Sequence, residues 1–120
     1  MRLLTCFLLL LSLSGCSVEY GPGSSLSGID ISTVDASQAI VVDVRSQSEW
    51  ESGHLKQAVH IPHNEIGERI DEVTSDKSAL IVLHCKKGGR AGKAMSTLEG
   101  LGFTNVINGG SFDDMQKHFE

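Results

Sequence analysis

Residues 79–101 read ALIVLHCKKGGRAGKAMSTLEGL, and this stretch decides the fold of the chain. Residues 79–83 form an apolar run that is typical of a buried strand. Cys85 ends the run, and Gly88 and Gly89 follow it. Apolar residues then recur at helical spacing: Ala91, Ala94, Met95, Leu98 and Leu101. The sequence therefore predicts a strand, a tight glycine turn and a helix around one cysteine.

The surroundings of Cys85 favour the thiolate over the thiol. A glycine turn can direct successive backbone N–H groups at one sulfur atom, and the N-terminus of the following helix adds a partial positive charge. Four of the ten basic residues of the chain lie in this stretch: Lys86, Lys87, Arg90 and Lys93. Because the thiolate is the nucleophilic form of cysteine, the stretch predicts a pocket for an anion at a reactive thiol.

Strand and helix patterns alternate along the rest of the chain. Residues 40–44 are almost uniformly β-branched, as in a strand buried on both faces. Ser46 and Glu49 have capping-box spacing at the start of a short helix that Gly53 ends. Further elements are expected at 58–62 (strand), 64–73 (helix), 105–107 (strand), 108–110 (turn) and in a last amphipathic segment ending at Phe119. This order predicts an α/β domain with a parallel sheet and right-handed crossovers.

Composition narrows the function classes. The 120 residues leave room for one domain, and no internal repeat is apparent. A formal net charge of −5 makes the chain a poor candidate for nucleic-acid binding. Of its three cysteines, Cys6 and Cys16 lie near the N-terminus, so Cys85 has no intramolecular partner. A lone thiol of this kind is unusual in an oxidising compartment unless its chemistry is used.

The N-terminal residues have the pattern of an export signal. Arg2 precedes an apolar run over residues 3–13 that is too short to span a bilayer. Its ending, residues 13–16 (LSGC), resembles a bacterial lipobox, which implies a lipoprotein signal peptide over 1–15 and a lipid on the Cys16 thiol. Residues 16–28 then form a flexible tether. Ordinary secretion and an uncleaved anchor are the alternatives.

The resemblance to a lipobox sets the expected location. The chain is expected to be an exported bacterial lipoprotein, anchored to the membrane through its N-terminal lipid and facing the periplasm. Ser17, which follows the cysteine, favours the outer membrane.

A series of motifs falls in order from residue 29 to residue 120: VVDVR (41–45), EW (49–50), GHL (53–55), AVHIP (58–62), CKKGGRA (85–91) and GG (109–110). Together they resemble a single-domain rhodanese, of the small periplasmic type. The resemblance implies a rhodanese-like domain over 29–120 with a five-stranded parallel sheet flanked by helices. It places the catalytic cysteine at Cys85 and the active-site loop at residues 85–90.

The resemblance implies a thiosulfate sulfurtransferase, and the chemistry of the residues points the same way. The Cys85 thiolate would take sulfane sulfur from a small anionic donor such as thiosulfate and pass it to a thiol or to cyanide. We expect neither a cofactor nor a metal. Two alternatives remain open: a persulfide carrier that a partner protein loads, and a thiol redox sensor with an exposed thiol.

Other cysteine enzymes fit the loop less well. Related cysteine phosphatases need an arginine six residues after the cysteine, whereas Arg90 lies five residues after Cys85. A loop one residue shorter suits a sulfur atom better than a phosphate. Thioredoxin-like exchange is disfavoured because no second cysteine is placed to resolve the first.

The residues of the loop are expected to bind the substrate. Gly88 and Gly89 let the backbone curl around the sulfur. Arg90 is expected to contact the anion directly, while Lys86 and Lys87 raise the local potential.

Residues outside the loop are expected to support it. Asp43 and Arg45 follow a strand and are expected to form an ion pair that supports the loop, and Glu49 to be a helix cap or a partner of Arg45. Trp50 is expected in the core, with a place at the mouth of the pocket as the alternative, and His84 is expected on the opposite face of its strand from Cys85.

Three histidines invite a metal-site interpretation: His54, His60 and His63. Their spacing across a strand and a proline turn is weak support for such a site.

Overall fold

A parallel sheet organises residues 30–119, the part of the chain that the computed structural model describes. Its strand order is β2-β1-β3-β4, with β1 at Ile40–Asp43, β2 at Val59–His60, β3 at Ile81–Cys85 and β4 at Val106–Ser111. Every strand pair is parallel. The predicted α/β class and parallel sheet are confirmed.

The sheet of the described residues has four strands, one fewer than the resemblance implied. The segment ahead of β1 forms the 3-10 turn η1 (Ile31–Thr33). There the Asp30 carboxylate accepts a hydrogen bond from the backbone N–H of Ser32 at 2.9 Å, which caps the turn. Among the described residues, this segment is therefore a capped turn and not a strand.

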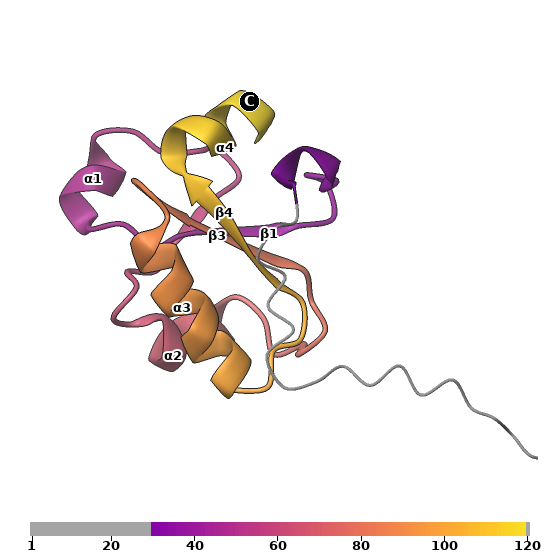
Figure 1. The fold of residues 1–120 in the computed structure, drawn as a ribbon. Coiled ribbons are helices and arrows are strands. Elements are labelled where there is room, and N and C mark those ends of the chain that lie inside the picture. Colours follow the sequence, from indigo (N-terminus) through magenta and orange to yellow (C-terminus); the bar gives the residue numbers. More distant parts are fainter. Residues whose placement is uncertain (1–29, 120) are drawn as a thin grey trace, which may run out of the picture.

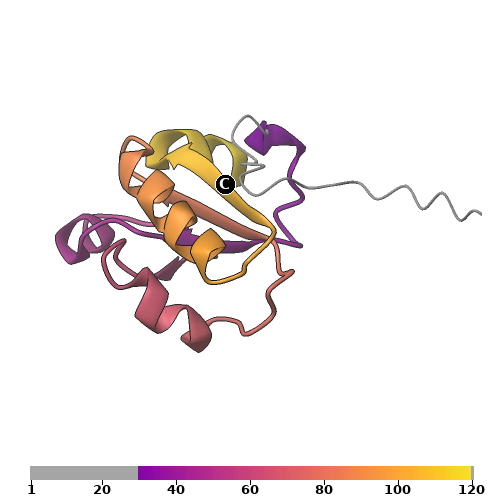
Figure 2. The same cartoon turned by 60° about the horizontal axis from the view of Figure 1, so that its bottom comes forward.

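Helices cover both faces of the sheet (Figures 1 and 2). On one face lie α2 (Ile66–Arg69), the 3-10 turn η2 (Ile70–Glu72) and α3 (Gly89–Gly100), whose apolar residues pack with Val42, Ile81 and Leu83. On the other lie η1 and α4 (Phe112–Phe119), with Val41 and Val82. Burial on both faces explains why β1 and β3 are almost wholly apolar.

The predicted capping box starts helix α1 (Gln47–Glu51). The Ser46 hydroxyl accepts from the Glu49 N–H, and the Glu49 carboxylate accepts from the Ser46 N–H at 3.2 Å. The chain leaves the helix through Gly53, whose φ of +144° favours glycine. The helix predicted over 64–73 is shorter, because regular α-helix covers only α2 and the chain then tightens into η2.

The turn predicted at residues 108–110 is wrong, since β4 continues through these residues to Ser111. Leu83 pairs with Asn108 and Cys85 pairs with Ser111, so β4 uses one more residue than β3 over this interval. The strand therefore bulges where the sequence has two glycines. A side chain at Gly109 would have its Cβ 2.6 Å from the Met115 sulfur, so the close approach of α4 requires glycine there.

The carboxyl ends of β1 and β3 meet at one edge of the sheet, where Asp43 pairs with His84. Cys85 is the last residue of β3, and α3 begins four residues later. This is the edge at which open α/β sheets bind ligands.

The N-terminal predictions lie outside the described residues: the signal peptide over 1–15, the lipidated Cys16 and the tether over 16–28. Within residues 30–119, no helix has the length and apolar character needed to cross a membrane.

Candidate active site

The Cys85 side chain lies at the end of β3, on the face of the sheet that α3 covers. Its sulfur accepts a hydrogen bond from the backbone N–H of Gly88 at 2.9 Å. Only 1% of the residue is exposed, so the exposed thiol assumed for a redox sensor is wrong. A reagent must enter the loop to reach this sulfur.

Gly88 gives the loop its shape. Its φ of +101° lies in the left-handed region, which a side chain would strain. Its carbonyl accepts from the Gly92 N–H at 3.0 Å, which starts α3, and from the Asn108 side chain at 3.1 Å. The side-chain oxygen Oδ1 of Asn108 accepts in turn from the Gly110 N–H at 2.9 Å. Asn108 thus ties the loop to the bulge of β4.

No local sequence pattern predicts this role for Asn108. An asparagine before two glycines is the usual signal of a turn, and it predicts a turn here. Only the pairing of β4 with β3 shows that the amide faces the loop.

A hollow of about 480 Å³ opens above the cysteine. Its lining consists of Cys85, Lys86, Lys87, Gly89, Arg90 and Lys93. The structure therefore brings together five of the six predicted loop residues and adds Lys93 from α3, while Gly88 packs toward β4. Four cationic side chains line the hollow and no carboxylate does, so it suits an anion.

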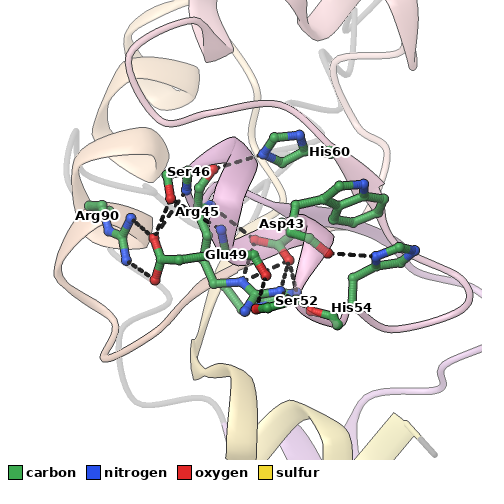
Figure 3. A network of polar contacts seen from close by, with 11 residues as sticks. Asp43, Arg45, Ser46, Glu49, Ser52, His54, His60 and Arg90 are labelled. Carbon is green, nitrogen blue, oxygen red and sulfur yellow. Dashed lines mark hydrogen bonds and ion pairs between the residues drawn. The ribbon is translucent and has the colours of Figure 1, made fainter.

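Arg90 is held by Glu49 (Figure 3). Its Nη1 lies 2.6 Å from Oε1 and its Nη2 lies 3.0 Å from Oε2, a bidentate pair between α3 and α1. The Arg90 hydrogen bonds, with smaller contributions from Ser46, lower the pKa of Glu49 from 4.5 to about 2. Glu49 in turn raises the pKa of Arg90, and the Cys85 sulfur adds to this to a lesser extent.

Glu49 is thus a helix cap, as predicted, but its predicted alternative role as a partner of Arg45 is wrong. The reason is that Arg45 already pairs with the carboxylate of Asp43, the last residue of β1. The direct contact between Arg90 and an anion stays a prediction.

Asp43 and Arg45 form the ion pair that was predicted (Figure 3). Both are buried, and Arg45 Nη2 lies 2.7 Å from Asp43 Oδ2 and 2.7 Å from the Gly53 carbonyl. The Phe112 ring covers the guanidinium at 4.3 Å. The pair fixes the segment between β1 and α1 and does not line the hollow.

His84 lies on the opposite face of β3 from Cys85, as predicted: the latter packs with Ala91 of α3, whereas the imidazole faces the Phe112 ring. His84 is fully buried, and neither ring nitrogen has a hydrogen-bond partner. Its Nε2 lies 3.9 Å from the Asp43 carboxylate. Burial lowers the pKa of His84, so the ring is neutral and has no access to the reacting sulfur.

The core position predicted for Trp50 is wrong, because this residue is half-buried and stacks on two histidines. Its ring lies 3.5 Å from that of His54 and 5.0 Å from that of His60. The Nε2 atom of His60 lies 2.8 Å from the Arg45 carbonyl. Across residues 30–119, no three histidine, cysteine or acidic side chains gather in a way that could hold a metal ion.

A buried thiol in a glycine loop, between the central strand of a parallel sheet and a helix N-terminus, defines a class of α/β proteins that carry a cysteine in an anion-binding loop. The family follows from comparison with known proteins. Residues 31–117 match the rhodanese-like domain, and the chain belongs to that family.

Among curated relatives, the chain is similar to the thiosulfate sulfurtransferase PspE of Escherichia coli, at 32% identity over 62% of this chain and 71% of that protein. It is also similar to the putative sulfur carrier protein YrkF of Bacillus subtilis (34%; 62% of this chain, 40% of that protein). A tRNA uridine(34) hydroxylase of Sodalis glossinidius is 38% identical over 62% of this chain, but only 22% of that enzyme is matched.

A solved structure described as a rhodanese with anions, from E. coli, superposes with a TM-score of 0.61 at 32% identity. The match covers 63% of this chain and 89% of that one. Relatives of this family thus include proteins with different roles, and the similarity supports sulfur chemistry in general.

Proposed function

We propose that this protein is a sulfurtransferase that moves sulfane sulfur through a persulfide on Cys85. The donor is a small sulfur anion such as thiosulfate, and the acceptor is a thiol or cyanide. The observation that carries the proposal is the position of the Cys85 sulfur, which accepts the Gly88 N–H at 2.9 Å at the base of a hollow lined by four cations.

The first step forms the persulfide. The Cys85 thiolate attacks the outer sulfur of thiosulfate, a new S–S bond forms, and the S–S bond of thiosulfate breaks with its electron pair leaving on sulfite. The product, Cys85–S–S⁻, carries one negative charge at the outer sulfur. Backbone N–H groups and cations of the loop stabilise this charge as they stabilise the thiolate.

The second step discharges the persulfide. The acceptor attacks the outer sulfur, and the Cys85 sulfur leaves as the thiolate, so cyanide becomes thiocyanate or a thiol becomes a persulfide. No net oxidant or reductant is needed in either half. This is covalent catalysis of the double-displacement kind, which predicts ping-pong kinetics.

Similarity supports the same proposal. PspE is a thiosulfate sulfurtransferase, and the E. coli rhodanese structure is described as containing anions. The lysines at the hollow match the double negative charge of thiosulfate.

Turnover with thiosulfate and cyanide tests the proposal. The wild-type protein is expected to form thiocyanate in many equivalents per Cys85, and Cys85→Ser is expected to form none while keeping its thermal transition. Serine nearly matches cysteine in size but cannot carry sulfane sulfur. Thiocyanate production by the folded serine variant would remove Cys85 from the mechanism.

A persulfide carrier is the second candidate, and the burial of Cys85 is the observation that favours it. A persulfide that is almost closed off from solvent would survive until a partner protein receives it. The similarity to a putative sulfur carrier supports this role. Stable persulfide on Cys85 with less than one equivalent of thiocyanate formed would favour the carrier over the enzyme.

We also propose that the protein is an exported lipoprotein, held at the membrane through Cys16 and facing the periplasm. The support is the sequence of residues 1–17 alone. Radiolabelled palmitate is expected to label the wild-type protein in a bacterial host but not Cys16→Ser. Equal labelling of both would reject the lipid at Cys16.

A further inference from the structure

Arg90 lines the hollow and is also paired with Glu49, which does not line it. Both terminal nitrogens of Arg90 bind the two carboxylate oxygens of Glu49, at 2.6 and 3.0 Å. Arg90 is one of the residues that line the hollow together with Cys85. Bidentate pairs of this geometry are stronger and more directional than a single hydrogen bond.

The carboxylate is itself held in place. The Ser46 hydroxyl donates to Glu49 Oε1 at 2.9 Å, and the Ser46 N–H donates to the same oxygen at 3.2 Å. The pKa of Glu49, about 2, keeps the carboxylate ionised throughout the pH range of any assay. The capping box of α1 therefore sets where the guanidinium of α3 points (Figure 3).

The lysines at the hollow differ from Arg90 in this respect. Among residues 30–119, no ion pair involves Lys86, Lys87 or Lys93. All three are exposed. They can meet the charge of an incoming donor with no ion-pair partner among residues 30–119, whereas Arg90 is held by Glu49 through two of the five N–H donors of its guanidinium.

We propose that Glu49 is a positioning residue that holds the Arg90 guanidinium against the Cys85 sulfur. In this arrangement Arg90 stabilises negative charge on sulfur, while the three lysines and the loop backbone receive the donor. For the persulfide the inference rests on the proposed function. For the thiolate it does not, because forming a thiolate on Cys85 requires no donor.

The sign of one measurable shift distinguishes this role from simple electrostatics. Removing a negative charge near a thiol ordinarily favours the thiolate, and the thiol then reacts at lower pH. If Glu49 positions Arg90, its loss releases a positive charge from the sulfur, and the thiol then reacts only at higher pH. The two explanations therefore predict opposite shifts for Glu49→Gln.

The experiment is the pH dependence of Cys85 alkylation by iodoacetamide, followed in the full chain by mass spectrometry of the peptide that contains Cys85. Glu49→Gln is expected to raise the midpoint pH and to slow alkylation at pH 7 by roughly threefold to tenfold. Glu51→Gln is the matched control, since it removes the same charge from the same helix without touching the hollow. It is expected to leave the midpoint within error of the wild type.

Arg90→Ala completes the test. In that background Glu49→Gln is expected to lose its upward shift, because no guanidinium is left to position. A midpoint that falls in Glu49→Gln when Arg90 is present would overturn the inference, since Glu49 would then act only as a charge. An unchanged midpoint with a lowered thermal transition would also overturn it, as a structural role predicts.

Failure of the inference and failure of the proposed function are separate outcomes, since alkylation requires no sulfur donor. Should the predicted shift appear in a protein that thiosulfate does not load, the positioning role stands and the donor assignment fails. Normal loading without the shift would keep the proposed function and overturn the role of Glu49.

Discussion

At the scale of single residues, the two neighbours at the end of β3 have opposite surroundings. Cys85 has a backbone N–H donor and faces the hollow, whereas His84 is buried with no partner for either nitrogen. The alternation of side chains along a strand separates them. We therefore place the proposed chemistry on Cys85 and expect His84 to affect stability only.

We predict that His84 makes the fold less stable as the pH falls below about 6.5. Burial lowers the pKa of His84 in the folded state, so below the unfolded value of about 6.5 the unfolded chain binds a proton that the folded chain does not. Protonation of His84 therefore costs the fold no stability above that pH. The free energy of unfolding decreases as the pH falls from there toward the pKa of His84 in the folded state. The free energy of unfolding at pH 5.5 is therefore expected to be lower than that at pH 7.5.

Urea unfolding at those two pH values measures the effect. His84→Leu is expected to lose this part of the pH dependence and to be at least as stable as the wild type, because no buried nitrogen is left unpaired. His84→Gln should lose the pH dependence while keeping a buried polar group. A leucine variant with the full wild-type slope would contradict the assignment.

Single residues were predictable where a short pattern defines them. Cys85 stands between an apolar run and two glycines, and that local order predicts it as the nucleophile. The partner of Arg90 lies 41 residues away, so no local pattern links the two. Glu49 was predicted as a cap from its spacing to Ser46, and only the folded structure reveals its second contact, the ion pair with Arg90.

At the scale of elements, the bulge of β4 supports the active-site loop. It sets Asn108 against the Gly88 carbonyl and places Gly109 under α4. We predict that Gly109→Ala lowers the free energy of unfolding by roughly 1–3 kcal/mol, the usual range for overpacking. Its Cβ would lie 2.6 Å from the Met115 sulfur and 2.9 Å from Val82 Cγ1.

The matched control is Gly100→Ala at the end of α3, where a Cβ meets no atom within 4 Å. That variant is expected to be neutral or slightly more stable, as alanine is in helices. Thermal unfolding of both variants provides the measurement. Equal stability of the two variants would show that α4 can move away from β4 at little cost.

Element prediction succeeded where the signals are local. The capping box of α1 and the apolar periodicity of α3 both depend on residues close together in the sequence, and both elements form where predicted. β4 was predicted too short because its last residues have the composition of a turn. The bulge exists only through pairing with β3 and packing under α4, which composition does not encode.

At the scale of the whole molecule, a chain of net charge −5 presents a hollow lined by four cations. We predict that Lys87→Gln raises the KM for thiosulfate roughly twofold at low ionic strength, as expected for about 0.5 kcal/mol from one exposed charge. The effect should fade at higher salt, because the Debye length falls from about 30 Å at 0.01 M to about 8 Å at 0.15 M.

Lys117→Gln is the control for net charge, since this exposed lysine lies on α4 and not at the hollow. Its KM is expected to match that of the wild type at every salt concentration. If both variants raised KM equally, the overall charge of the protein would be responsible and not the lysines at the hollow.

The whole fold was predictable from the sequence to the level of its layers. Runs of apolar residues buried on both faces require helices on both sides of the sheet, and the two clusters of buried residues confirm this. The number of strands was not predictable, because the described residues ahead of β1 form a capped turn at Ile31–Thr33 in place of a strand.

The central claim is that Cys85 carries sulfur. Intact mass spectrometry of the reduced protein after incubation with thiosulfate tests it most directly, with Cys85→Ser treated in the same way. We predict the added mass of one sulfur atom on the wild-type protein, its loss on addition of cyanide, and no addition to the serine variant. A folded, reduced wild-type protein that gains no sulfur would contradict the claim.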